Sequence, residues 1–331
     1  MFDLCPYNTF GLHVQAREGI LVKSVNDLKY VDPDNCIIIG RGSDVLFTDD
    51  YDGTALINDI RDLEISKDGD DFIVKAGGGL VLDDLILELL KLGICGLENL
   101  SAIPGTVGAA PVQNIGAYGV EIGSLIESVE CYDLYKHSLE VFTADQCNFG
   151  YRTSYFKQNP QQKLFITKVV FHLYSIFKPV LAYHGLNDVD LADASAVRER
   201  VMALRFEKLP DYKIIGNAGS FFKNPVVSLE FAKNLKKIYD NMPIYHIDEN
   251  TCKLAAGWLI DNAGCRGLTH GNVGTWKKQA LVIVNYGFAR PHEIVSLAKY
   301  IQSEVAAKFG IELEPEVRIF GRKGEIGWES L

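Results

Sequence analysis

The first half of the chain alternates short apolar runs with polar and glycine-rich segments. Runs of this kind predict strands at residues 36–40, 45–47, 54–58, 72–76, 129–134, 139–143 and 165–173. Residues 80–92 predict a helix, because Asp83 and Asp84 come early, Lys91 comes late and Gly93 follows. Strands interspersed with single helices favour an α+β domain that ends near Lys178.

Helices are more frequent in the rest of the chain. Residues 291–309 predict the clearest one, with Pro291 at its first position, Gly310 after its end, and an apolar stripe of Ile294, Leu297, Ile301 and Val305. Further helices are expected at 194–208 before Pro210, from a Ser228 cap to Lys237, and at 255–263 before Gly264. Strands are expected at 280–285 and 312–320.

Composition narrows the class of protein. A chain of 331 residues with 47% hydrophobic residues suffices for two domains, each with a core. The net charge of −10 argues against nonspecific binding to nucleic acid or anionic membranes. We expect no signal peptide, since no basic segment followed by an apolar core opens the sequence. The seven cysteines are scattered without a CxxC pair, so we expect reduced thiols, no metal site and a cytoplasmic location.

The stretch from Ser101 to Glu121, SAIPGTVGAAPVQNIGAYGVE, is the most informative part of the chain. It is rich in glycine and alanine and contains neither lysine nor arginine. Glycine lets the backbone approach a ligand closely, and backbone N–H groups bind phosphate oxygens without a cationic side chain. Its apolar spacers, among them Ile103 and Val107, argue that the stretch is packed down rather than a free surface loop. It therefore predicts a site for something flat or phosphorylated.

Three other segments carry candidate chemistry. Gly150-Tyr151-Arg152 places an arginine after an aromatic residue, Ser220 follows two glycines within GNAGSFFKNP, and Glu314-Pro315-Glu316-Val317-Arg318 offers two carboxylates. Strand alternation would put Glu314, Glu316 and Arg318 on one face. Taken singly, a surface arginine, a turn serine and a solvated strand end are the better interpretations. No GxSxG surrounds Ser220, so a hydrolase triad is unsupported.

A second glycine turn, Gly40-Arg41-Gly42-Ser43, joins two predicted strands. It is neither a dinucleotide-binding GxGxxG, because Val45 replaces the third glycine, nor a phosphate-binding GxxxxGKS/T loop. Alone this turn is a weak signal for a ligand site, and it gains significance only beside the glycine-rich stretch at Ser101–Glu121.

Together these motifs closely resemble the UDP-N-acetylenolpyruvoylglucosamine reductases, the MurB family of flavin enzymes, in the version with a tyrosine loop. Ten pieces occur in the family's order: residues 8–11, 40–46, 96–98, 103–108, 113–119, 149–152, 208–210, 216–225, 253–261 and 313–318. They span nearly the whole chain, and the combination is far more specific than any single motif.

The resemblance implies a fold. It implies an α+β protein with an FAD-binding region of the vanillyl-alcohol-oxidase (PCMH) type at 1–178, in two subdomains at about 1–58 and 59–178. A C-terminal α+β substrate-binding domain would span 179–331, with the last strand, at about 311–331, packing back on the FAD domain.

By the same resemblance, two loops would hold the FAD pyrophosphate and ribityl chain. One loop supplies Gly40, Arg41, Gly42, Ser43, Asp44 and Val45; the other supplies Pro104, Gly105, Thr106, Gly108, Asn114, Ile115, Gly116, Ala117 and Tyr118. Asp44 stands where the family usually has asparagine. A carboxylate near a pyrophosphate is unfavourable unless it points away or accepts N–H groups.

The family's chemistry has two hydride steps, from NADPH to FAD and then from flavin N5 to C3 of the enolpyruvyl group. The resemblance implies that Arg152 binds the substrate carboxylate and that Ser220 gives a proton to C2. Glu316 would have to be protonated, or to act through a water or Ser220, because a bare carboxylate would repel the developing negative charge.

The resemblance also implies a substrate, UDP-N-acetylglucosamine enolpyruvate, and a place in peptidoglycan synthesis, hence in cell-wall growth, cell shape and division. Its matching substrate-binding positions are Tyr151, Tyr183, Lys208, Asn224, Tyr245 and Gln279. Small molecules are the expected partners, with no nucleic acid and no membrane, and we expect a monomer.

Two alternatives stay open at this point. A related FAD oxidase acting on an alcohol or a hydroxy acid would share the fold and react fast with oxygen. This alternative does not explain why Lys208, Ser220 and Glu316 occur together. A binding or regulatory protein could keep the nucleotide fold without turnover. The presence of Arg152, Ser220 and Glu316 argues against it.

Overall fold

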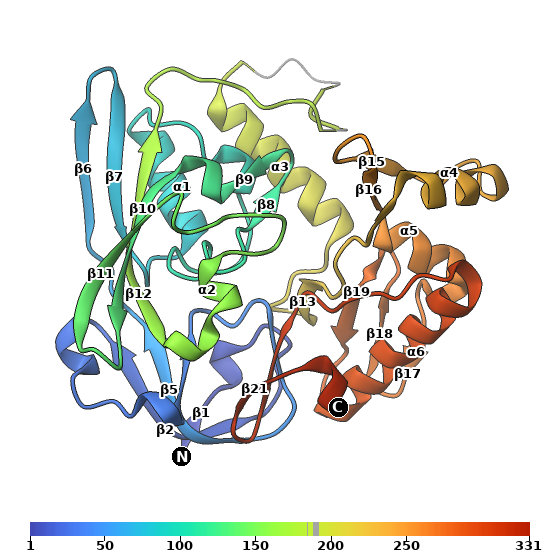
Figure 1. Cartoon of the computed structure of the whole chain (residues 1–331), viewed down its shortest axis with the longest axis horizontal. Helices are drawn as coiled ribbons and strands as arrows, with labels where there is room; N and C mark the ends of the chain where they lie inside the picture. The colour runs from blue at the N-terminus through green and yellow to red at the C-terminus, as the bar shows by residue number, and fades with distance from the viewer. Residues whose placement is uncertain (184, 188–191) are drawn as a thin grey trace. The chain divides into compact units, whose positions relative to one another are not determined.

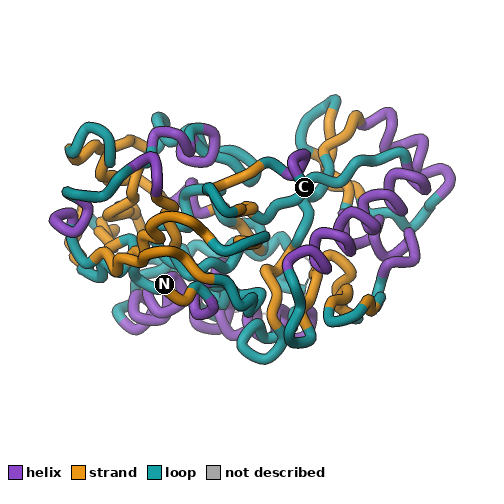
Figure 2. The backbone as a smooth tube through the Cα atoms, turned by 90° about the horizontal axis from the view of Figure 1, so that it is seen from below, coloured by secondary structure: helices purple, strands orange, loops and turns teal. Residues whose placement is uncertain are grey.

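The computed structural model describes residues 1–183, 185–187 and 192–331. The chain forms two compact units, each assembled from several segments. Unit 1 comprises Met1–Phe2, Ala16–Gly42 and Asp52–Phe206, and unit 2 comprises Asp3–Gln15, Ser43–Tyr51 and Glu207–Leu331. Loops, drawn in teal in Figure 2, connect the strands and helices of each unit.

An antiparallel sheet of five strands is the framework of unit 1 (Figure 1). Its order is β11-β10-β12-β7-β6. The strands are β6 (Leu63–Asp68), β7 (Asp71–Gly77), β10 (Ile126–Asp133), β11 (Ser138–Thr143) and β12 (Leu164–Leu173). Helix α1 (Leu82–Lys91) buries Leu82, Leu85, Ile86 and Leu89, and these join Val74, Val129 and Phe171 of the sheet in one core cluster.

A second sheet, of order β1-β2-β5-β3, lies mostly in unit 1. It contains β1 (Phe2–Asp3), β2 (Gln15–Val22), β3 (Cys36–Ile39) and β5 (Tyr51–Asn58), and β3 and β5 run parallel. Short strands β8 (Gly116–Ala117) and β9 (Val120–Glu121) form a separate hairpin. Helix α2 (Tyr155–Gln158) begins at Ser154, and α3 (Ala194–Lys208) packs Val197, Val201 and Leu204 around Leu186.

Unit 2 is built on two small antiparallel sheets. One has the order β13-β19-β18-β17, and the other β14-β16-β15. Their strands are β13 (Gly216–Ser220), β14 (Val226–Ser228), β15 (Ile244–His246), β16 (Thr251–Leu254), β17 (Thr269–His270), β18 (Val273–Trp276) and β19 (Gln279–Asn285). The helices of this unit are α4 (Leu229–Ile238), α5 (Ala256–Ile260) and α6 (Pro291–Phe309).

A third sheet of unit 2 joins distant parts of the sequence. Strand β20 (Arg318–Gly321) pairs antiparallel with β21 (Gly324–Ile326) and parallel with β4 (Val45–Phe47). The N–H of Arg318 donates to the carbonyl oxygen of Asp44 at 3.0 Å. A strand near the C-terminus therefore lies beside one from the first fifty residues. The domain boundary at residue 178 stays a prediction.

Several local predictions are confirmed. Helix α6 has the predicted bounds, and Gly310 ends it with a φ of 66°. The Ser228 hydroxyl caps α4 by accepting from the N–H of Phe231 at 3.2 Å. None of the described helices combines the length and the apolar character that a membrane crossing needs.

Three local predictions are wrong in part. The final strand begins only at Arg318, because Pro315 has no N–H to donate and forms an isolated bridge with Phe222 instead. Ser220, a turn serine when its motif is taken singly, instead ends β13, and its register partner in β19 is Val282. The predicted helix at 255–263 is α5 followed by a five-residue π-turn, Asp261–Cys265, in which Gly264 has a φ of 84°.

Candidate active site

The two glycine-rich segments meet within unit 1. A Cβ on Gly40 would lie 2.6 Å from Thr106 Oγ1 and 3.3 Å from the Ala109 Cβ, so only glycine fits here without a shift. The Thr106 hydroxyl is buried and finds no hydrogen-bond partner among the described residues. A buried hydroxyl without a partner beside close-packed backbone suits a ligand that supplies an acceptor. The pairing therefore fits the predicted FAD loops.

Backbone hydrogen bonds join the stretch Ser101–Glu121 to residues 78–82, where α1 begins. Gly108 N–H donates to Gly78 O at 2.8 Å, Val107 N–H to Leu80 O at 2.9 Å, and Leu82 N–H to Gly105 O at 3.2 Å. Because the Gly108 N–H is used in this way, Gly108 contributes close packing rather than a free donor. A Cβ there would lie 3.0 Å from the Gly78 Cα.

Arg152 lies at the tip of a tight turn in unit 1. Gly150 and Thr153 exchange backbone hydrogen bonds at 3.1 and 3.2 Å, which leaves Tyr151 and Arg152 between them. Arg152 has a φ of 54°, a conformation rare for residues with a side chain. Its Nη2 donates to Gly116 O at 3.1 Å, and its guanidinium lies 5.3 Å from the centroid of the Tyr151 ring. Strain of this kind concentrates at functional sites.

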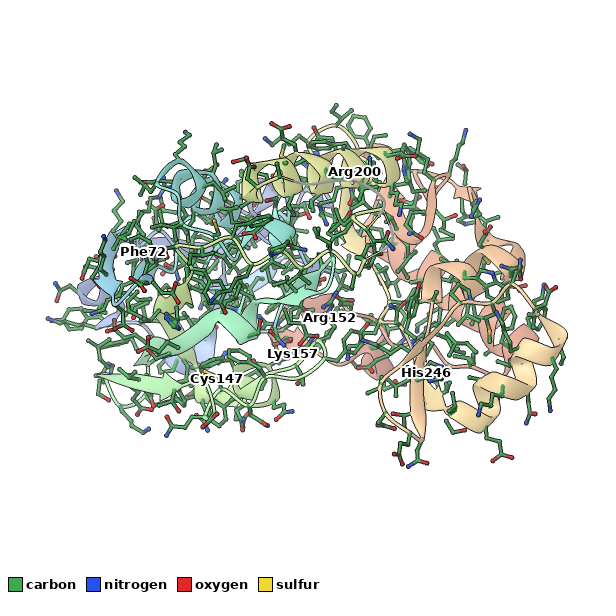
Figure 3. The ribbon with its side chains drawn as sticks, turned by 90° about the horizontal axis from the view of Figure 1, so that it is seen from above. Phe72, Cys147, Arg152, Lys157, Arg200 and His246 are labelled. Atoms are coloured by element: carbon green, nitrogen blue, oxygen red, sulfur yellow. The ribbon has the colours of Figure 1, made fainter. Side chains whose placement is uncertain are left out.

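Side-chain hydrogen bonds connect the turn around Arg152, and the residues after it, to the stretch Ser101–Glu121. Asn114 Nδ2 donates to Gly150 O at 3.0 Å, Ser154 Oγ to Val112 O at 2.5 Å, and Lys157 Nζ to Gln113 Oε1 at 3.2 Å. Figure 3 labels Arg152 of this turn and Lys157 of α2, which follows it. Asn114 is buried and itself has a φ of 47°. Unit 1 therefore brings the predicted carboxylate-binding arginine onto the predicted cofactor loop.

Tyr118, at the end of that loop, contacts Tyr183, a predicted substrate-binding residue. The Tyr118 and Tyr183 rings pack edge to face with centroids 5.0 Å apart. Burial raises the pKa of the Tyr118 hydroxyl, and the charge of Arg205 lowers it in part. Buried Asn99 donates through Nδ2 to both Tyr118 O and Val180 O at 2.8 Å. Asn99 was not singled out from the sequence, where a polar residue near a glycine-rich stretch gives no sign of being buried.

Ser220 and Glu316 lie in unit 2 and are joined there through the backbone. Glu316 N–H donates to Phe221 O at 2.8 Å, and Lys223 N–H donates to Glu314 O at 2.9 Å, on either side of the bridge between Phe222 and Pro315. Glu316 is half-buried and Glu314 is exposed, and Glu314 is ion-paired with Lys223. The structure therefore pairs the segment that contains the predicted glutamate with the residues that follow the predicted proton donor.

Two predicted substrate contacts gather at the start of α5. Asn224 Oδ1 accepts from Ala256 N–H at 2.9 Å. Gln279 Oε1 would lie 2.5 Å from a Cβ on Gly257. Tyr245 is half-exposed and pairs with Lys253 in β15 and β16, while Lys208 is exposed at the end of α3.

The rest of the turn that begins at Gly40 lies just before β4. Arg41 is exposed, whereas Gly42 is buried with a φ of 59°. In unit 2, Thr9 Oγ1 donates to Ser43 O at 3.3 Å, and the Asp44 carbonyl accepts from Arg318. Arg318 is bonded to both carboxylate oxygens of Glu325, at 2.9 and 2.6 Å.

Comparison with known proteins gives independent matches to both halves. Residues 210–320 match a family described as UDP-N-acetylenolpyruvoylglucosamine reductase, C-terminal domain, and residues 21–136 match an FAD binding domain. The chain is 43% identical over 329 residues to the UDP-N-acetylenolpyruvoylglucosamine reductase of Neisseria gonorrhoeae, covering 95% of each. It is 40% identical to the Escherichia coli (strain K12) protein of that name over 332 residues, covering 98% of this chain and 97% of the relative.

A solved structure supports the fold. The structure of UDP-N-acetylenolpyruvylglucosamine reductase from Thermus caldophilus is similar with a TM-score of 0.67, at 23% identity over 96% of both chains. At that identity the likeness concerns the fold, which is the predicted combination of an FAD-binding region with a C-terminal domain.

Proposed function

The chain belongs to the UDP-N-acetylenolpyruvoylglucosamine reductase family, and from this premise we propose its reaction. It reduces UDP-N-acetylglucosamine enolpyruvate to UDP-N-acetylmuramate with NADPH, in peptidoglycan precursor synthesis. The observation that carries the proposal is identity of 43% along nearly the full length of a curated relative. FAD, when held by the residues named below, would supply the redox chemistry that links NADPH to the enolpyruvyl group.

Residues of two segments would hold the FAD. They are Gly40, Arg41, Gly42, Ser43, Asp44 and Val45, together with Pro104, Gly105, Thr106, Gly108, Asn114, Ile115, Gly116, Ala117 and Tyr118. The close approach of Gly40 to Thr106 and the buried Thr106 hydroxyl support this assignment. Glycines let a flat dinucleotide lie close to the chain.

Three side chains would act on the substrate. Arg152 binds its carboxylate, for which a guanidinium has matched geometry. Ser220 delivers a proton to C2 as negative charge builds there. Glu316 assists as a proton donor, directly or through a water or Ser220. The backbone bridge between the Ser220 and Glu316 segments supports a joint role for these two residues.

The nucleotide part of the substrate would contact Tyr151, Tyr183, Lys208, Asn224, Tyr245 and Gln279. The gathering of Asn224 and Gln279 at the first turn of α5 supports a common role for them. We further propose a monomer that works in the cytoplasm, with the domain boundary near residue 178. Seven free thiols agree with a reducing compartment. Light scattering tests the oligomeric state.

An anaerobic titration tests the activity. Protein loaded with FAD is expected to be yellow, to bleach with NADPH, and to recover its colour on addition of the enolpyruvyl nucleotide. Recovery with oxygen but not with the enolpyruvyl nucleotide would indicate an oxidase instead. Protein that neither contains nor takes up FAD would overturn the proposal.

A further inference from the structure

Asp83 connects three elements of unit 1 through one carboxylate. Its Oδ1 accepts from the N–H of Ala102 at 2.7 Å. Arg198 of α3 donates to the same carboxylate with both terminal nitrogens, Nη1 to Oδ1 at 2.5 Å and Nη2 to Oδ2 at 2.9 Å. The side chains are only 28% and 10% exposed, so water competes weakly for these bonds. The sequence pattern assigned Asp83 only a favourable charge in the first turn of a helix.

Ala102 is held on both sides. While its N–H donates to Asp83, its carbonyl oxygen accepts from Nε of Arg205 at 3.2 Å. Its φ is 58°, in the left-handed region that residues with a Cβ rarely adopt. Two side chains thus fix a backbone conformation that alanine does not favour by itself.

Ala102 is the entry to the predicted cofactor loop. From Gly105 to Gly108 the loop is joined to residues 78–82 by backbone hydrogen bonds, and the bond between Asp83 and Ala102 adds a side-chain contact three residues before Gly105. The direction in which the chain leaves Ala102 sets the path of Pro104 and Gly105 toward Thr106. A change at Ala102 would therefore alter the approach of the chain to the buried Thr106 hydroxyl.

We propose that Asp83 is a positioning residue that, through Ala102, holds the 103–108 loop in its FAD-binding form before FAD binds. The inference rests on the proposed function and adds to it. Asp83 itself lies 22 residues before Gly105, the first glycine of the loop, and acts through Ala102. Pre-ordering of this kind strengthens binding because the ligand no longer has to order the loop.

The affinity of FAD-free protein for FAD tests this inference. Asp83→Ala is expected to raise the FAD Kd roughly tenfold, the change that about 1.4 kcal/mol produces. The matched control is Asp84→Ala: the neighbouring carboxylate is exposed, and its removal is expected to leave the Kd within about twofold. An unchanged Kd for Asp83→Ala, with or without a loss of stability, would overturn the inference.

Ala102→Gly separates loop geometry from general support of the fold. Glycine adopts a positive φ without a Cβ penalty, so the single variant is expected to bind FAD nearly as well as the parent. In the Asp83→Ala background it is expected to recover part of the lost affinity. Failure of this rescue contradicts a role exerted through the backbone of Ala102.

Hydrogen exchange covers the case in which Asp83→Ala does not fold. In the unaltered protein freed of FAD, the Ala102 amide is expected to exchange slowly, because Asp83 holds it without the cofactor. Exchange at the rate of an unstructured amide would overturn the inference. If the unaltered protein does not bind FAD at all, the proposed function fails, and that result is distinct from equal FAD binding by parent and variant.

Discussion

The main-chain N–H of Glu316 donates to the carbonyl oxygen of Phe221 at 2.8 Å, which ties Glu316 to the residue that follows Ser220. The bridge between Phe222 and Pro315 continues the contact, and Lys223 and Glu314 close it on the far side. The segments that carry these two candidate residues, nearly a hundred residues apart in sequence, are thus paired through main-chain hydrogen bonds.

Glu316→Gln tests the glutamate in this arrangement. The amide keeps the size of the side chain but cannot supply a proton, so we expect reduction of the enolpyruvyl substrate to slow by on the order of 10². Stopped-flow reoxidation of the reduced enzyme measures this step. The matched control is Glu314→Gln, two residues away and exposed, for which the rate should stay within about twofold. Equal effects in the two variants would contradict the assignment.

Arg152→Lys keeps the charge but loses the planar fork and the bond from Nη2 to Gly116 O. We expect kcat/KM for the enolpyruvyl nucleotide to fall by on the order of 10². Reduction by NADPH should change little, because the substrate carboxylate takes no part in it. Steady-state kinetics and anaerobic bleaching measure the two quantities, with exposed Arg61→Lys as the control. A comparable loss in both would argue for a structural role of Arg152.

Much of the architecture could be predicted from local pattern. The α6 stripe, its flanking proline and glycine, and the Ser228 cap are signals within a few residues of the element they define. The proximity of Gly40 to Thr106 fits the family resemblance, in which two loops hold one cofactor, because the turn at Gly40 is a weak signal by itself. Local pattern was sufficient for the helix and the cap.

Other features depend on partners that the local sequence does not name. Pro315 prevents a strand from continuing, and its bridge to Phe222 lies across more than ninety residues. Asn99 and Asp83 owe their roles to Val180 and Arg198 respectively, far along the chain. Such contacts arise from tertiary packing, so neither periodicity nor propensity could reveal them.

Gly40→Ala should weaken FAD binding. The added Cβ would meet Thr106 Oγ1 at 2.6 Å, and the Thr106 side chain is short, β-branched and buried, so it has little room to move aside. Overpacking of this kind costs roughly 1–3 kcal/mol, so we expect the FAD Kd to rise at least about fivefold. Flavin retained after gel filtration gives the readout. Gly327→Ala, where a Cβ meets nothing within 4 Å, serves as the control, and retention equal to that control would refute the prediction.

The Asp83 carboxyl gives a pH dependence of stability. Burial raises its pKa, but the bond from Arg198, the Ala102 N–H and the charges of Arg198 and Arg205 outweigh burial, so the pKa lies below the ordinary 3.8. A lowered folded-state pKa means that the stabilisation is complete above the unfolded value and is lost as the pH falls through the folded one. Urea unfolding should therefore show a constant advantage over Asp83→Ala from about pH 7 to about pH 5, which shrinks below about pH 4. An advantage independent of pH down to about pH 2 would contradict this assignment of the charge.

The most direct test of the catalytic account is anaerobic stopped-flow analysis of Ser220→Ala in its two half-reactions. The account predicts that NADPH bleaches the flavin at nearly the parent rate, whereas reoxidation by the enolpyruvyl nucleotide slows by roughly 10²–10⁴ because the proton for C2 is missing. Equal slowing of both half-reactions, or normal reoxidation by the enolpyruvyl nucleotide, would contradict it.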